Sequence, residues 1–223
     1  MKIRSAVALA LLSLLLLQRP FGTETPAAAD ECGRGMAMLA KAYLALGAMT
    51  ASFQQTLDAK ALNQRETESG TLFLAQGGRM RWQYDRHAGK LAVSDGRKTY
   101  LYIPEERQVF VQPLDTGPLA PVTLRLLLGK VDVAKEFSCE SAAESDGSVT
   151  LKLALKESLA GVQDLEVRLN EKTSLVDRVA YKDALGNSIT LELSNIKTGT
   201  ALDPALFQFQ PPKGVEVIQG GAS

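Results

Sequence analysis

The sequence predicts a mainly β fold with two helices (α+β), in which about ten antiparallel strands form a strongly curled sheet or partial barrel. Three observations predict this fold. From Gly70 to Leu193, apolar and polar residues alternate with a period of two, as they do in strands that bury one face. Turn residues separate these runs every eight to twelve positions or so, which is typical of antiparallel hairpins. Two stretches with helical patterns accompany the strands, and we expect them on the concave side of the sheet.

The first 29 residues resemble an export signal. Two basic residues precede an apolar run over 6–17, and alanines at 27–29 suit cleavage before Asp30. The run is too short to span a bilayer as a helix, although an uncleaved anchor is the alternative. We therefore expect a signal peptide over 1–29 and one exported domain over 30–223.

Cys32 and Cys139 are the two cysteines of the chain. In an oxidising compartment they most simply form a disulfide, which would close a loop of roughly 100 residues and contribute up to about 4.7 kcal/mol. The sequence alone does not show that the two sulfurs meet. Lipidation of Cys32 is the alternative, and the acidic Glu31 before it argues against that reading. No metal site is expected, because His87 is the only histidine and the cysteines lack ligand spacing.

A first helix is predicted over residues 35–55. Its side chains either pack on the sheet or form a lid that adapts to an apolar ligand. Residues 56–69 are polar and predict a loop or a frayed helix end. The apolar residues that recur at steps of three and four, and so share one helix face, are Leu39, Tyr43, Leu46, Met49 and Phe53.

The period changes to two at Gly70, and the following strands form a predicted meander. Asp95-Gly96 and Pro104-Glu105-Glu106 are its clearest turns. We assign to one apolar face of this meander the alternating residues Leu72, Leu74, Met80, Trp82, Tyr84, Leu91, Val93, Leu101, Ile103, Val109 and Val111.

A second, short helix is predicted between Pro118 and Gly129, within a leucine-rich run that would cover or plug the sheet. Strand alternation then returns up to Leu193, and it includes Leu151 and Leu153 on its apolar face. Periodicity does not distinguish a filled core from a cavity for an apolar ligand.

Few residues of the chain could carry catalytic chemistry. His87 lies in a turn-like segment, and the chain has no nucleophile elbow, no phosphate-binding glycine loop and no zinc-protease motif. The 25 basic and 25 acidic residues balance, which argues against a nucleic-acid-binding protein. We expect no enzyme, no cofactor, no nucleotide site and no nucleic-acid partner. A glycosidase with two scattered carboxylates stays open as an alternative, because such a pair leaves no local signature.

Several short motifs stand in an order that resembles the LolA family of periplasmic lipoprotein carriers, over residues 35–218. The combination is more specific than any single motif. The motifs are Ser52-Phe53-Gln54-Gln55, Gly70-Thr71-Leu72, Arg81-Trp82-Gln83-Tyr84, Val93-Ser94-Asp95-Gly96, Asp203-Pro204-Ala205-Leu206-Phe207-Gln208-Phe209 and Pro211-Pro212-Lys213-Gly214-Val215.

The resemblance implies an unclosed, strongly curled antiparallel β-barrel of about ten or eleven strands, with a helical lid over a hydrophobic cavity. It also implies a periplasmic monomer that takes acylated lipoproteins from an inner-membrane ABC transporter and passes them to an outer-membrane acceptor. Candidate cavity residues are Leu39, Tyr43, Leu46, Leu72, Leu74, Met80, Trp82, Tyr84, Leu91, Val93, Leu101, Ile103, Val109, Val111, Leu151 and Leu153.

The chain departs from the family pattern at the place of an arginine that is proposed to hold the lid. Gln76 aligns at that place. The role of the family arginine does not transfer to Arg79, which we expect in a turn, or to Arg81, which we expect on a solvent-exposed face. A disulfide is also not general in the family. These departures affect the lid mechanism and the partners more than the fold.

Three other functions stay open. The chain could be a lipid-sensing or glycolipid-binding protein of the same fold that acts through a membrane partner. It could also be an exported hydrolase or a purely structural envelope protein.

Overall fold

The computed structural model describes residues 26–45, 47–86, 89–114, 126–127, 132–156 and 161–220. Its helices and short helical turns are α1 (Pro26–Ala45), η1 (Lys60–Leu62), α3 (Val133–Glu136) and η2 (Pro204–Phe207). Its strands are β1 (Ala48–Ala59), β2 (Gln64–Ala75), β3 (Arg79–Tyr84), β4 (Leu91–Asp95), β5 (Lys98–Ile103), β6 (Gln108–Pro113), β7 (Phe137–Ser145), β8 (Ser148–Leu155), β9 (Gln163–Asn170), β10 (Val176–Lys182), β11 (Ser188–Thr198) and β12 (Glu216–Gln219).

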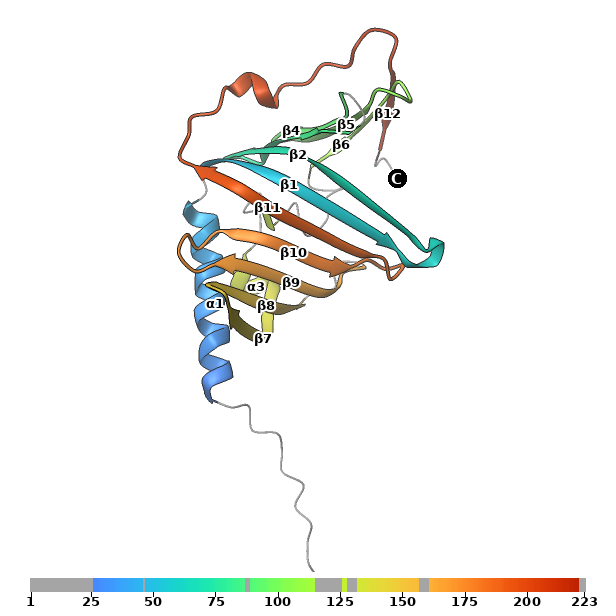
Figure 1. The fold of residues 1–223 in the computed structure, drawn as a ribbon. Coiled ribbons are helices and arrows are strands. Elements are labelled where there is room, and N and C mark those ends of the chain that lie inside the picture. Colours follow the sequence, from blue (N-terminus) through green and yellow to red (C-terminus); the bar gives the residue numbers. More distant parts are fainter. Residues whose placement is uncertain are drawn as a thin grey trace, which may run out of the picture.

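All twelve strands belong to one sheet, in the order β12-β6-β5-β4-β3-β2-β1-β11-β10-β9-β8-β7. Strand β12 pairs with β6 in parallel, and the other pairs are antiparallel. The sheet curls strongly, and β12 and β7 form its two separate edges (Figure 1). The predicted curled, unclosed antiparallel barrel is therefore confirmed, with twelve strands in the described ranges where about ten or eleven were expected.

The predicted helix over 35–55 is wrong in its second half. Helix α1 ends at Ala45, and Met49 and Phe53 lie on strand β1. Residues four positions apart share a face in a helix and also in a strand, so their spacing fits both structures. Ala51, between them, is buried as well, which is the period-two pattern of a strand.

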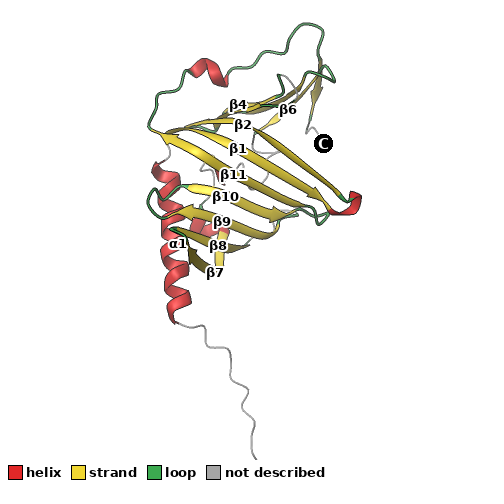
Figure 2. Cartoon of the chain, viewed as in Figure 1, coloured by secondary structure: helices red, strands yellow, loops and turns green. Residues whose placement is uncertain are grey.

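The polar stretch 56–69, predicted to be a loop or a frayed helix end, is the far part of the β1–β2 hairpin (Figure 2). The two strands pair from Ala48↔Ala75 to Ala59↔Gln64. The outer half of the hairpin is largely exposed, and its composition is polar for this reason.

Helix α1 packs on the concave side of β7, β8 and β9. Leu39 and Ala42 are buried against a cluster that includes Leu151 and Val167. The helix comes close to the sheet at Gly35, where an added Cβ would lie 2.5 Å from Cδ2 of Leu151. The helix is therefore closely packed here, and a larger residue would require the Leu151 side chain to shift.

A disulfide and ion pairs also attach α1 to the sheet. A disulfide joins Cys32 to Cys139 on β7 with a Cα–Cα distance of 5.8 Å, which confirms the predicted pairing. Arg34 forms ion pairs with Glu144 and, at 3.1 Å, with Glu171. These contacts hold the start of the helix at the β7 edge.

The second predicted helix, between Pro118 and Gly129, lies mostly outside the described residues. Leu126 and Leu127 are described, and both are helical and buried. The short α3 follows, and Asp132 caps it by accepting a hydrogen bond from the backbone N–H of Lys135 at 3.2 Å. The segment thus returns the chain to the sheet at β7.

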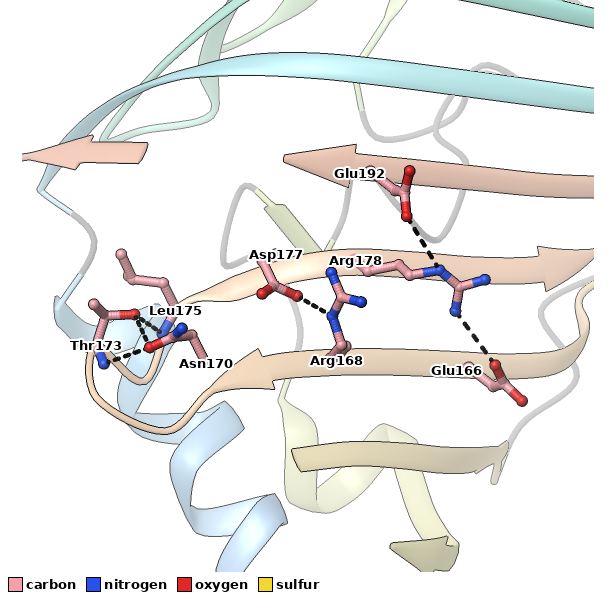
Figure 3. A network of polar contacts seen from close by, with 8 residues as sticks. All are labelled: Glu166, Arg168, Asn170, Thr173, Leu175, Asp177, Arg178 and Glu192. Carbon is pink, nitrogen blue, oxygen red and sulfur yellow. Dashed lines mark hydrogen bonds and ion pairs between the residues drawn. The ribbon is translucent and has the colours of Figure 1, made fainter. Parts of the chain in front are cut away.

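The convex face of β9, β10 and β11 is polar (Figure 3). Arg178 lies between Glu166, at 3.5 Å, and Glu192, at 3.8 Å, and Arg168 contacts Asp177 at 2.6 Å. Ion pairs with at least one partner well exposed, as here, each contribute about 0–1 kcal/mol. The network therefore adds little stability, and its charged side chains mark this face of the sheet as the solvent-exposed one.

Among the described residues, no helix combines the length and the apolar character needed to cross a membrane.

Candidate functional site

The pairing register sorts the predicted cavity residues onto the two faces of the sheet, because paired residues in neighbouring strands point to the same side. Leu72 pairs with Trp82, Leu74 with Met80, and Trp82 with Ala92, which in turn pairs with Leu101. All of these residues share one face. Through β11, β10 and β9 the same register leads to Leu151, which contacts α1, so this is the concave face.

The assignment of Leu91, Val93, Val109 and Val111 to the same wall is wrong. Val93 pairs with Arg81 and with Tyr100, Leu91 and Val109 pair with Tyr102, and Val111 pairs with Tyr100. These four residues lie on the convex face. The sheet buries both faces here, so alternation does not indicate which face is the concave one.

The segment that follows β11 covers this part of the convex face. Arg81 Nη1 donates a hydrogen bond to the carbonyl oxygen of Leu206 at 3.2 Å. The guanidinium of Arg79 lies 5.5 Å from the ring centroid of the buried Phe207. The ring of Phe209 lies 5.7 Å from the rings of Tyr100 and Tyr102.

Arg81 therefore holds the C-terminal segment, in contrast to the solvent-exposed position expected for it. Arg79 bonds the β2–β3 turn, as expected, and also lies beside Phe207. Burial lowers the pKa of Arg81 from its usual value. Gln76, at the place of the family arginine, lies in the β2–β3 turn, where its backbone N–H donates to Gly47 and its carbonyl accepts from Arg79 Nε.

The concave face of the β1–β3 and β11 region carries a continuous apolar surface, which we call the aromatic wall. Each of its side chains is buried, and Leu114 and Leu127 pack against it. The aromatic wall consists of Met49, Ala51, Phe53, Leu72, Leu74, Met80, Trp82, Leu191 and Leu193.

Three rings organise this wall. Phe53 meets Trp82 edge to face with centroids 4.6 Å apart, and it meets Tyr84 in the same way at 5.3 Å. Trp82 Nε1 donates a hydrogen bond to Met80 Sδ at 3.3 Å. Burial, and then the charge of Glu68, raise the pKa of Tyr84, so its hydroxyl stays protonated. The wall therefore ends in a neutral hydrogen-bond donor at Tyr84.

The remaining predicted residues divide between the two halves of the concave face. Leu39, Leu151 and Leu153 belong to the cluster under α1, whereas Leu101 and Ile103 lie half-buried beyond the aromatic wall. The side chain of Tyr43 and all of Leu46 lie outside the described part of the chain.

Sequence reasoning missed five residues of the aromatic wall, and Leu114, which packs against it. Met49 and Phe53 have a spacing that predicts a helix, Ala51 and Leu114 show no distinguishing pattern, and Leu191 and Leu193 show only strand alternation. The pairs Phe53↔Leu193 and Gln55↔Leu191 join β11 to β1, and such long-range pairing has no local signal. Within the described ranges, no group of three or more His, Cys, Asp or Glu side chains could hold a metal ion.

Comparisons with known proteins agree with this architecture. Residues 45–210 match the family model described as "Outer membrane lipoprotein carrier protein LolA". The outer-membrane lipoprotein carrier protein of Pseudomonas syringae pv. syringae is 31% identical over 197 residues, 87% of this chain and 91% of the relative. The protein of the same name from Dechloromonas aromatica is 28% identical over 174 residues, 76% of this chain and 80% of the relative.

Solved structures share the fold. An uncharacterized conserved protein from Thermus thermophilus superposes with a TM-score of 0.52 at 14% identity, covering 84% of this chain and 98% of that protein. A DUF1329 family protein from Desulfovibrio piger gives a TM-score of 0.50 at 13% identity, and the match covers 80% of this chain and 97% of that protein.

Proposed function

Because the chain belongs to the LolA family of outer-membrane lipoprotein carrier proteins, we propose that it carries lipoproteins and shields their acyl chains on the aromatic wall. One observation supports this most: the wall is a continuous apolar surface on the concave side of a sheet that stays open between β12 and β7. An open sheet of this kind can admit a flexible chain between the wall and its cover.

The free energy at stake explains why a carrier is needed. Each methylene group moved out of water contributes about 0.8 kcal/mol, so a chain of a dozen or so methylenes is worth on the order of 10 kcal/mol. An apolar wall lowers the free-energy cost of exposing the acyl chains to water during transit. The same wall must also release the acyl chain. The protein's own cover, which buries each wall side chain in this structure, favours release because it competes with the acyl chain for the wall.

We place the acyl chains at the aromatic wall and not under α1. The disulfide, the Arg34 ion pairs and the close approach at Gly35 all hold α1 against β7 and β8. Leu39, Leu151 and Leu153 then act as permanent core. The cavity residues in this proposal are the aromatic wall together with Tyr84, Leu101 and Ile103.

The proposal includes the compartment and the partners. Residues 1–29 act as a signal peptide, and the domain that follows works in the periplasm as a monomer without enzymatic activity. An inner-membrane ABC transporter loads it and an outer-membrane acceptor receives the lipoprotein. The energy for loading comes from the transporter, because the sequence has no phosphate-binding glycine loop.

Two leucines on neighbouring strands give a matched test. Leu101 on the concave face and Leu91 on the convex face are both half-buried. A buried carboxylate disfavours an apolar ligand, so Leu101→Glu should weaken binding of a triacylated peptide at least tenfold. Leu91→Glu should leave the affinity within twofold, provided that circular dichroism shows both variants folded.

Equal affinities of the two folded variants would contradict the placement of the cavity. A wild-type protein that binds phospholipid or glycolipid but no triacylated peptide would instead be a lipid-binding protein of the same fold.

A further inference from the structure

We propose that Lys90, Glu68 and Tyr84 form a polar subsite at the rim of the aromatic wall, which binds the ester and amide groups that join acyl chains to a lipoprotein. This inference rests on the proposed carrier function and specifies what the rim of the site recognises.

The backbone brings the three residues to the concave face. Tyr84 pairs with Gly70, and Glu68 lies two positions before Gly70 on β2, so both side chains point to the same side. The backbone N–H of Tyr84 donates to the carbonyl oxygen of Lys90 at 3.3 Å, which places Lys90 opposite Tyr84. The three residues thus form one patch across β2, β3 and the start of β4.

Side-chain contacts connect this patch to the aromatic wall. Lys90 Nζ is ion-paired with Glu68 and lies 4.5 Å from the ring centroid of Tyr84. The same Tyr84 ring packs edge to face on Phe53 of the wall. The concave surface therefore changes from aromatic to charged within the width of one side chain.

The burial of this ion pair sets it apart from comparable pairs. The side chains of Lys90 and Glu68 are 18% and 17% exposed, whereas those of Lys182 and Asp164 are 49% and 53% exposed. Both charges are partly withdrawn from water and so lose some of their hydration, which their mutual attraction offsets. A polar ligand group that adds hydrogen bonds would replace part of the lost hydration.

The chemistry of the patch fits an acyl linkage. The ammonium group of Lys90 has three N–H donors, and the neutral hydroxyl of Tyr84 is a further donor, both suited to ester carbonyl oxygens. Glu68 accepts hydrogen bonds and suits the amide N–H of an acylated peptide. Acyl chains on the wall would place these groups at the rim.

The test compares two probes: a tripalmitoylated cysteinyl peptide, and diphenylhexatriene, a hydrocarbon without polar atoms. Lys90→Met should weaken binding of the lipopeptide about tenfold and leave diphenylhexatriene binding within twofold. Lys182→Met, which breaks the exposed pair, is the matched control and should change neither affinity. An equal loss for both probes, or no loss for either, would overturn the subsite.

The double variant Glu68→Gln/Lys90→Met distinguishes ligand binding by Lys90 from a role of Lys90 in neutralising the charge of Glu68. The subsite predicts that the loss of lipopeptide affinity persists, because the ammonium donors of Lys90 are gone. Full recovery would overturn it, since Lys90 would then serve only to neutralise Glu68.

Dipalmitoylglycerol, which has ester groups but no amide, distinguishes a peptide from a lipid source of the linkage. Glu68→Met, which removes the acceptor oxygens, should weaken the lipopeptide more than the diacylglycerol; an equal effect on the two would contradict the amide contact. Failure of the wild type to bind the lipopeptide at all would overturn the carrier function itself, whatever the variants do.

Discussion

The ring of Phe53 on β1 reaches over β2 to meet the ring of Trp82 on β3, with centroids 4.6 Å apart and an interplanar angle of 66°. Gly70, the register partner of Phe53 on β2, makes room for this contact because it has no side chain. The contact joins two strands that are not hydrogen-bonded to each other. It makes the aromatic wall one continuous surface.

Gly70→Ala should destabilise the fold by about 1–3 kcal/mol, as overpacking usually does. An added Cβ would lie 1.9 Å from the carbonyl oxygen of Gln83 and 2.8 Å from Cε1 of Phe53. Gly47→Ala is the control, since an added Cβ there meets no atom within 4 Å. Urea unfolding of both variants measures the difference, and equal stabilities would contradict the close approach.

Replacing both cysteines, Cys32→Ser with Cys139→Ser, should lower the free energy of unfolding by about 2–5 kcal/mol. The folded variant should still bind a triacylated peptide with an affinity close to that of the wild type, because α1 covers the half of the concave face that we assign to the core. Thermal unfolding and peptide titration at a temperature where the variant is folded check both statements. A large loss of affinity would show that ligand does contact the region under α1.

Tyr84→Phe should flatten the loss of stability at alkaline pH. Burial raises the pKa of Tyr84 above the usual tyrosine value near 10, so above about pH 10 the unfolded chain releases this proton while the folded protein keeps it. The contribution of Tyr84 is thus fully present below pH 10 and is lost as the pH rises toward its folded pKa.

The measurement for Tyr84 is urea unfolding of wild type and variant from pH 8 to pH 11. Above pH 10, the free energy of unfolding of the wild type should fall by up to about 1.4 kcal/mol per pH unit more than that of Tyr84→Phe. Parallel curves for the two proteins would contradict the raised pKa.

Phe207→Ala should destabilise the protein by about 3–5 kcal/mol, because this side chain is buried on the convex face beside Arg79. Leu206→Ala is the control. It should cost less than about 1.5 kcal/mol, since Arg81 contacts the backbone carbonyl of Leu206, which the variant keeps. Lipopeptide affinity of the folded Phe207 variant should stay close to that of the wild type, and a selective loss of binding would place ligand on the convex side.

Much of the fold could be predicted from the sequence. The alternation from Gly70 onward identified nine strands, and turns such as Asp95-Gly96 identified their hairpins. Strand β1 was missed because the spacing of Met49 and Phe53 fits both a helix and a strand. The edge strands β7 and β12 were missed because they expose most of their residues and show little apolar alternation.

The candidate site was harder to predict. Alternation correctly grouped Leu72, Leu74, Met80 and Trp82 on one face. It did not show that Val93 and Val109 lie on the other face, because the C-terminal segment, far away in the sequence, buries that face as well. Only tertiary contacts such as Arg81 with Leu206 distinguish the two.

Trp82, the single tryptophan of the chain, offers the most direct test of the central claim. Bromine atoms quench tryptophan fluorescence at contact range, so a triacylated peptide with brominated chains should quench Trp82 as it binds. The unbrominated peptide should bind equally well without that quenching. Stoichiometric binding, shown by native mass spectrometry, with unchanged Trp82 fluorescence would contradict acyl chains on the aromatic wall, and absence of binding would contradict the carrier function.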